Sequence, residues 1–151
     1  MRRALLGCAL LVGCGYDAVE SVPVSQLDGT FFAASVQPVV ARSCASLDCH
    51  GMDGRPLRLY SEDGLRRRDD LRGQPLSADE LAWNVDAFEA LDPEPPFVDD
   101  HIALRKPLEL DAGGIHHVGG ELWPSREHPE HRCLRTWLAG ELDPAPCTAA
   151  R

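Results

Sequence analysis

Two cysteines and a histidine lie close together in the first half of the chain, and their spacing constrains the fold more than any other feature. Cys44 and Cys49 are separated by four residues, and His50 follows the second cysteine directly. A domain built on this segment must keep both thiols in one short loop and place the imidazole beside them. With 151 residues and 44% hydrophobic content, the chain is long enough to bury one core around such a loop.

The N-terminus predicts export, which determines how the cysteines are interpreted. Arg2-Arg3 forms a positive segment, residues 4–12 are apolar, and Leu11-Val12-Gly13-Cys14 resembles a lipobox. An apolar stretch this short cannot span about 30 Å of hydrocarbon. We therefore expect residues 1–13 to be a lipoprotein signal peptide and Cys14 to become a lipidated N-terminus. An uncleaved apolar anchor is the alternative.

The expected location is the periplasmic side of a bacterial membrane, with residues 14–29 as a tether. Gly15 rather than Asp follows the lipidated cysteine, which favours transfer to the outer membrane. The formal net charge of -9 and the pI of about 5.0 leave no basic field for nucleic acid. Membrane contact is therefore expected through the lipid, and nucleic-acid binding is not expected.

An exported chain rarely keeps free thiols, so each mature cysteine needs a covalent partner. Two cysteines followed by a histidine form the donor set that attaches one haem c. The thiols of Cys44 and Cys49 add to the two vinyl groups, and His50 becomes the proximal iron ligand. Since the usual spacing is C-x-x-C-H, the two extra residues must bulge outward. A small Cys44–Cys49 disulfide loop and a Cys/His structural metal site are alternatives, although a second C-x2-C pair that zinc favours is absent.

This assignment leaves Cys133 and Cys147, because Cys8 leaves with the signal peptide. We expect these two to form a disulfide, since the turn-forming segment 143–146 lets the end of the chain fold back. Closing this loop stabilises the fold by about 3 kcal/mol in the chain-entropy model. A free thiol at Cys133 and an intermolecular bridge are the alternatives.

Four segments resemble the class I-like cytochrome c domain, and more narrowly the planctomycete-type cytochrome c module, here in a bacterial lipoprotein. They are the apolar-Gln-Pro-apolar segment 36–40 running into the Cys49-His50-Gly51 motif, the L-x-x-K-P-L-like segment 102–108, the H-x-G-G-like loop 113–120, and the closing L-x-x-W-L-like segment 131–140. The resemblance implies an all-α fold, a small helical domain over residues 30–147 around one covalent haem, with residues 148–151 as a tail. The C-x4-C spacing and the extra His116 depart from the family pattern.

Helical periodicity agrees with an all-α domain. Apolar residues at helical spacing precede Cys44, and Pro38 is best placed in the first turn of a second helical segment. Ser77 begins a capping-box pattern, and the apolar stripe after it continues to about Leu91. A last helix is expected over residues 129–139.

A further helix is expected from Ser61, as its N-cap, to about Arg72. Glu62 precedes Arg66 by four residues, and Asp63 precedes Arg67 by four, so each pair would be adjacent on the surface of a helix. We interpret this charged run as a solvated surface.

The sixth iron ligand must be a histidine or water, because Met52 is the only methionine besides the initiator and lies too close to His50 to reach the other side of a haem. The candidates are His101, His116, His117, His128, His131 and an open, water-filled position. We favour His117, which occupies the histidine of the H-x-G-G-like loop, with His116 as the alternative. His128 and His131 are expected to face solvent.

The function implied is that of a membrane-tethered, extracytoplasmic one-electron carrier that binds haem c and exchanges electrons with redox partner proteins. His50 and His117 would make it an iron-containing, metal-binding protein of comparatively low potential. Lys106 or Arg105 could pair with haem propionates or serve only as surface charges. No catalytic nucleophile constellation is present, so an electron carrier is favoured over an enzyme. The alternatives are a haem-free, disulfide-stapled lipoprotein that binds a partner and a haem peroxidase-type enzyme.

Overall fold

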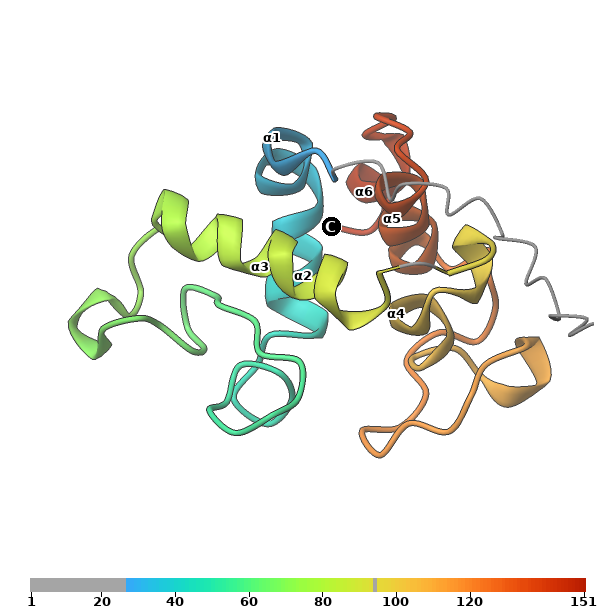
Figure 1. Cartoon of the computed structure of the whole chain (residues 1–151), viewed down its shortest axis with the longest axis horizontal. Helices are drawn as coiled ribbons and strands as arrows, with labels where there is room; N and C mark the ends of the chain where they lie inside the picture. The colour runs from blue at the N-terminus through green and yellow to red at the C-terminus, as the bar shows by residue number, and fades with distance from the viewer. Residues whose placement is uncertain (1–26, 94) are drawn as a thin grey trace, which may run out of the picture.

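The computed structural model describes residues 27–93 and 95–151, and this part of the chain is all-α, as predicted (Figure 1). Within these ranges the only β-type pairings are two isolated bridges, Tyr60 with Leu65 and Leu108 with Trp123. The helices are α1 (Gly29–Phe31), η1 (Phe32–Val36), α2 (Gln37–Ser43), η2 (Asp69–Leu71), α3 (Ala78–Leu91), η3 (Val98–Asp100), α4 (Ile102–Arg105), η4 (Leu110–Ala112), α5 (Pro129–Leu138) and α6 (Ala145–Ala149). The predicted signal peptide, the lipidated Cys14 and most of the tether lie outside the described residues.

The first three helical elements follow one another without a break and lead directly into Cys44. Asp28 caps α1 by accepting a hydrogen bond from the Phe31 amide at 2.7 Å. The middle element, η1, is a π-helical turn, and Pro38 lies in the first turn of α2. Proline lacks an amide hydrogen and its ring collides with the carbonyl four residues earlier, so a widened turn before it relieves the conflict. The prediction that Pro38 opens a second helical segment is confirmed.

The core is centred on three aromatic side chains from three helices. Phe32 of η1 lies 4.7 Å from Trp137 of α5 and 6.1 Å from Phe88 of α3, measured between ring centroids, and all three rings are buried. The indole of Trp137 also donates to the carbonyl oxygen of Asp28 at 3.0 Å. Burial of aromatic surface of this size supplies much of the stability of a small domain. This core fixes the exit of α2, and with it the position of Cys44.

A polar network connects α2 and α3 to the chain that follows His50. The Asn84 side chain accepts from the Tyr60 amide at 2.7 Å, donates to the Tyr60 carbonyl at 2.9 Å and donates to Gln37 at 2.8 Å. Asn84 and Gln37 are both buried, so their polar atoms require these partners. The network holds residue 60 against two core helices and thereby anchors the segment that returns from the cysteine loop.

The disulfide between Cys133 and Cys147 is present, with a Cα–Cα distance of 4.5 Å, so this prediction is confirmed. It joins α5 to α6, and both cysteines are completely buried. Residues 148 and 149, assigned to a tail from the sequence, lie in α6, and Ala150 is also buried. The end of the chain is therefore part of the packed domain.

The helix predicted from Ser61 to Arg72 is wrong, since this segment is irregular apart from the short turn η2. Arg66, expected on a solvated face, is buried and pairs with Glu80 of α3 at 2.9 Å. Its guanidinium also donates to the main-chain carbonyls of Leu71, Gln74 and Pro75. Arg66 therefore holds residues 71–75 in a loop around its guanidinium. The spacing of charges four residues apart in the sequence does not predict these main-chain contacts.

Candidate functional site

The cysteine loop is a closed turn at the C-terminal end of α2. Cys44 caps the helix, and its carbonyl oxygen accepts a hydrogen bond from the His50 amide at 2.9 Å. Within the loop, the Cys49 amide donates to the Ser46 carbonyl at 3.0 Å. Leu47 and Asp48 lie at the outside of this turn and are exposed. The four residues between the cysteines are therefore accommodated by a local turn that leaves the positions of Cys44 and His50 tied to each other.

Two glycines allow the rest of the chain to approach this loop closely. A Cβ atom on Gly51 or on Gly64 would overlap the carbonyl oxygen of Ala45. The same oxygen accepts a hydrogen bond from the Ser61 hydroxyl at 2.8 Å, and Ala45 is completely buried. Gly51 is thus required by packing, because any side chain there would displace the cysteine loop.

The two thiols of the loop are not joined to each other. Burial, with smaller contributions from the charges of Glu130 and Cys49, raises the pKa of the Cys44 thiol to about 12. Glu130 is held nearby by Ser43 and Arg42, which donate to its carboxylate at 2.6 and 2.7 Å. Cys44 is therefore a protonated thiol at neutral pH.

His50 has a defined orientation and protonation pattern. Its Nδ1 atom lies 3.0 Å from the carbonyl oxygen of Leu57, and since a carbonyl oxygen only accepts, Nδ1 carries the proton. Burial lowers the pKa of His50; the hydrogen bond to Leu57 opposes this effect, and the nearby His117 and Arg55 add to it. A neutral imidazole with its proton on Nδ1 presents a free electron pair on Nε2, which is the form that binds a metal.

His117 has the same arrangement on a different loop. It follows η4 in the glycine-rich segment 113–120, and its Nδ1 atom donates to the carbonyl oxygen of Gly120 at 2.9 Å. The Gly120 amide donates back to the His117 carbonyl at 3.0 Å, and Gly120 has a φ of 85°, a left-handed conformation that favours glycine. This turn therefore fixes the His117 ring and leaves its Nε2 without a role in the loop.

The structure brings His50 and His117 together. Their ring centroids are 6.1 Å apart and their planes differ by 11°. In Figure 1 the segment after α2 and the orange segment before α5 extend from the same side of the helical body. His116, the alternative, is exposed and only its main-chain carbonyl makes a described contact, with Lys106.

Two of the remaining sequence-derived ligand candidates, His101 and His131, are buried in the fold. His101 is buried, and its Nδ1 caps α4 by accepting from the Ala103 amide at 3.1 Å. His131, predicted to face solvent, is only 1% exposed, because helical periodicity places it on the same face of α5 as Leu134. His128 is half-buried at the start of the same helix, so the prediction of a solvent-facing side chain is wrong for His131 and only partly met for His128.

Exposed apolar side chains flank both histidines along the chain. Leu47 and Met52, within three residues of His50, are 45% and 43% exposed, and Val118, adjacent to His117, is 90% exposed.

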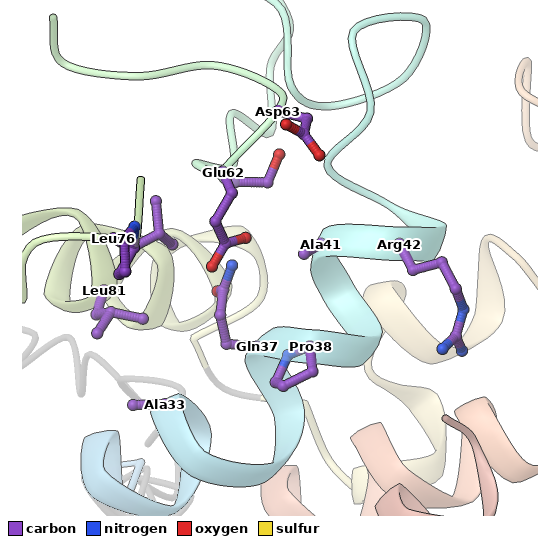
Figure 2. A pocket seen from close by; sticks show the side chains of 11 residues that line it. Ala33, Gln37, Pro38, Ala41, Arg42, Glu62, Asp63, Leu76 and Leu81 are labelled. Carbon is purple, nitrogen blue, oxygen red and sulfur yellow. The ribbon is translucent and has the colours of Figure 1, made fainter. Parts of the chain in front are cut away.

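A hollow in the described chain lies away from these loops. It encloses about 610 Å³ between α2 and the segment 61–76, beside the start of α3. Figure 2 shows the Glu62 and Asp63 carboxylates above Gln37, with Leu76 and Leu81 as an apolar wall. None of the cysteines or histidines predicted from the sequence lines it, so it is separate from the His50–His117 pair.

The expectation of a metal-binding protein requires correction. Within residues 27–93 and 95–151, no group of three or more histidine, cysteine, aspartate or glutamate side chains is placed to hold a metal ion. Nδ1 of each paired histidine is already bound to a carbonyl, which leaves only one nitrogen of each ring for a metal. Side chains alone therefore build no metal centre in these ranges, and the structural Cys/His metal site considered from the sequence is rejected there.

The comparisons add no relative from which a role could be transferred. No family model matches the sequence, and comparisons with curated proteins and with solved structures likewise find no match. No helix among the described residues is long and apolar enough to cross a membrane.

The groups that orient the two histidines, and that the sequence did not predict, are the main-chain carbonyls of Leu57 and Gly120. A main-chain carbonyl is present in every residue, so the residue type gives no signal for it.

Proposed function

We propose that this chain binds one haem c through Cys44 and Cys49, with His50 and His117 on the two sides of the iron, and that it transfers single electrons. The proposal includes the membrane tether at Cys14, the periplasmic side of the membrane as its location and redox proteins as its partners. A bound haem supplies one-electron chemistry at its iron, and the residues around it set the potential.

The observation that carries the proposal is the distance between the two histidine rings. A metal–imidazole nitrogen bond is about 2 Å long, and each nitrogen lies about 1.1 Å from the centre of its five-membered ring. Two imidazoles on opposite sides of one iron therefore have ring centres about 6 Å apart, and the centroids of His50 and His117 are 6.1 Å apart. Hydrogen bonds from Nδ1 to the Leu57 and Gly120 carbonyls leave Nε2 of each ring free, as an axial ligand needs.

The cysteine loop supports the same assignment. Covalent attachment requires two reduced thiols beside a fixed proximal histidine, and Cys44 and Cys49 are both free while the Cys44 carbonyl binds the His50 amide. Leu47, Met52 and Val118, which are close to the two histidines in the sequence, leave apolar surface exposed that a porphyrin could cover. With both His50 and His117 as proposed iron ligands, no open iron position would remain, which favours an electron carrier over a peroxidase-type enzyme.

The direct test is expression of the full chain in a periplasm that contains cytochrome c maturation machinery. We expect the haem to remain with the polypeptide after acid-acetone extraction and the protein mass to increase by one haem. The Cys44→Ala/Cys49→Ala variant should lose this increment. The Cys133→Ala/Cys147→Ala variant, which also lacks two cysteines, is the matched control and should keep it.

A wild-type protein whose mass lacks the haem increment under these conditions would overturn the proposal. The haem-free, disulfide-stapled binding protein would then be the better description, and peptide mapping should show Cys44 linked to Cys49. A high-spin spectrum of covalently bound haem would instead support an open iron position.

A further inference from the structure

We infer that Lys106 is a positioning residue that holds His117 opposite His50 by binding the main-chain carbonyl oxygen of His116. Lys106 directly follows α4, and its Nζ atom donates to the His116 oxygen at 2.9 Å. The purpose of this contact rests on the proposed function, in which His117 is the second axial ligand. The effect of this contact on the loop around His117 can also be measured in protein without haem.

The bonded oxygen belongs to the peptide unit that leads into His117. The carbonyl of His116 and the amide nitrogen and Cα of His117 lie in one plane, because the peptide bond does not rotate freely. Holding this oxygen therefore holds the plane from which the His117 side chain departs. A lysine ammonium donates a charge-assisted hydrogen bond, which is stronger than a bond between neutral groups.

The residues of the 113–120 loop that precede His116 are also attached to residues 105–109, at positions farther from His117. The Ile115 amide donates to the Arg105 carbonyl at 3.0 Å, and the Gly114 amide donates to the Glu109 carbonyl at 3.0 Å. Gly114 also passes so close to the carbonyl of Leu108 that a Cβ atom would overlap it. These contacts fix the part of the loop before His116 on the end of α4 and on the residues that follow it.

After the turn from His117 to Gly120, the chain next bonds to residues 105–109 at Leu122 and Trp123. The amides of Leu122 and Trp123 donate to the Pro107 carbonyl at 2.7 and 2.9 Å. Between Ile115 and Leu122, the hydrogen bonds of His117 itself are made to Gly120, inside the loop. Of the described hydrogen bonds that attach the loop to the rest of the chain, the Lys106 bond is therefore the one closest to His117.

Lys106 can be tested cleanly because it is the only lysine in the chain. Lys106→Met keeps the length of the side chain and removes its donor, whereas Lys106→Arg keeps a charged donor. Arg72→Met is the charge-matched control, since Arg72 makes only an exposed ion pair with Asp69 at 3.8 Å. Acetylation of amines modifies no side chain other than Lys106 and gives a second test without a mutation.

Two measurements read out the positioning role in the full-length protein. The first is the spin state of covalently bound haem. We expect Lys106→Met and the acetylated protein to gain a high-spin fraction, and Lys106→Arg and Arg72→Met to remain low-spin. The second is amide hydrogen exchange, which in Lys106→Met should become about tenfold faster at residues 115–120, the factor expected for loss of about one hydrogen bond, with α3 and α5 unchanged.

The outcomes separate this inference from the proposed function. A wild-type protein without covalent haem would reject the proposed function, and loop exchange in that protein would still test the Lys106 contact. The inference is overturned if Lys106→Met keeps both the wild-type spectrum and wild-type exchange over residues 115–120. It is also overturned if exchange accelerates equally in the loop and in α5, because Lys106 would then act on the whole fold.

Discussion

The rings of His50 and His117 lie 6.1 Å apart between centroids and within 11° of parallel, although the two residues come from different loops. Both rings donate from Nδ1 to a carbonyl of their own loop, so their positions do not depend on a bond between them. The neighbouring His116 is exposed. This difference between two adjacent histidines gives the first prediction.

We expect His117→Ala to convert a low-spin haem to high-spin, while His116→Ala keeps the low-spin spectrum. The reason is that the His117 ring lies 6.1 Å from the His50 ring, with its Nδ1 bound to Gly120, whereas the His116 side chain is exposed. Visible spectra of the oxidised and reduced variants measure the change. A low-spin His117→Ala protein together with a high-spin His116→Ala protein would show that His116, and not His117, is the second ligand.

Gly51→Ala tests the packing of the cysteine loop. The added methyl group would overlap the carbonyl oxygen of Ala45, which is buried between Gly51, Gly64 and Ser61. We expect a loss of about 1–3 kcal/mol in the free energy of unfolding, as for other overpacked sites, and a reduced yield of haem-loaded protein. Denaturant unfolding and the mass spectrum measure the two effects.

Gly29→Ala is the matched control for that substitution. A Cβ atom at Gly29 would meet only Val85, at an ordinary 4.0 Å, and the residue is helical. We expect its stability to be unchanged or slightly increased, since alanine restricts the unfolded chain more than glycine does. Equal stability of the Gly51→Ala and Gly29→Ala proteins would contradict the packing argument.

The sequence was sufficient for the parts of the fold that local chemistry determines. The capping box at Ser77 and the apolar spacing after it predict α3, and the structure has both the box and the buried Val85 and Phe88. The disulfide followed from counting cysteines, and the helical segment at Pro38 followed from its missing amide. The capping box and the Pro38 segment depend on residues that are close together in the chain. The disulfide could be predicted because two cysteines remained without another assignment.

Long-range contacts account for what the sequence could not predict. Arg66 has a suitable partner four residues away in Glu62, yet it pairs with the buried Glu80, which also receives the Ser77 hydroxyl and amide. The orientation of His50 depends on the Leu57 carbonyl, and that of His117 depends on Gly120. Main-chain acceptors are identical in every residue, so no residue type marks them in advance.

Thiol reactivity of the haem-free protein tests the environment of Cys44. Burial raises the pKa of this thiol to about 12, against an ordinary value of 9.0, so the reactive thiolate is scarce at pH 8. We expect alkylation of Cys44 to accelerate about a hundredfold or more when the protein is unfolded in urea, because the thiolate becomes more abundant. Quenched reaction with iodoacetamide followed by peptide mass analysis measures the rate. Equal rates in folded and unfolded protein would show that the thiol is not desolvated.

The buried pair of Arg66 and Glu80 predicts a specific loss of stability in acid. The guanidinium hydrogen bonds lower the pKa of Glu80 to about 2, against 4.5 in an unfolded chain. Between these two pH values the folded state therefore binds fewer protons than the unfolded state. The contribution of Glu80 to the free energy of unfolding is at its full value above about pH 4.5. As the pH falls from about 4.5 to about 2, we expect this carboxylate to account for a loss of about 3 kcal/mol in the free energy of unfolding.

Glu80→Gln removes the charge that titrates and leaves Arg66 buried without its counterion. We expect this variant to be about 3–5 kcal/mol less stable than wild type at pH 7, and the difference to shrink as the pH approaches 2. Asp79→Asn is the control, because its pair with Arg67 at 3.2 Å is solvent-exposed and contributes less than about 1 kcal/mol. Urea unfolding at a series of pH values gives each free energy. If Glu80→Gln and wild type lost stability in parallel below pH 4.5, the acid dependence would have to come from other carboxylates.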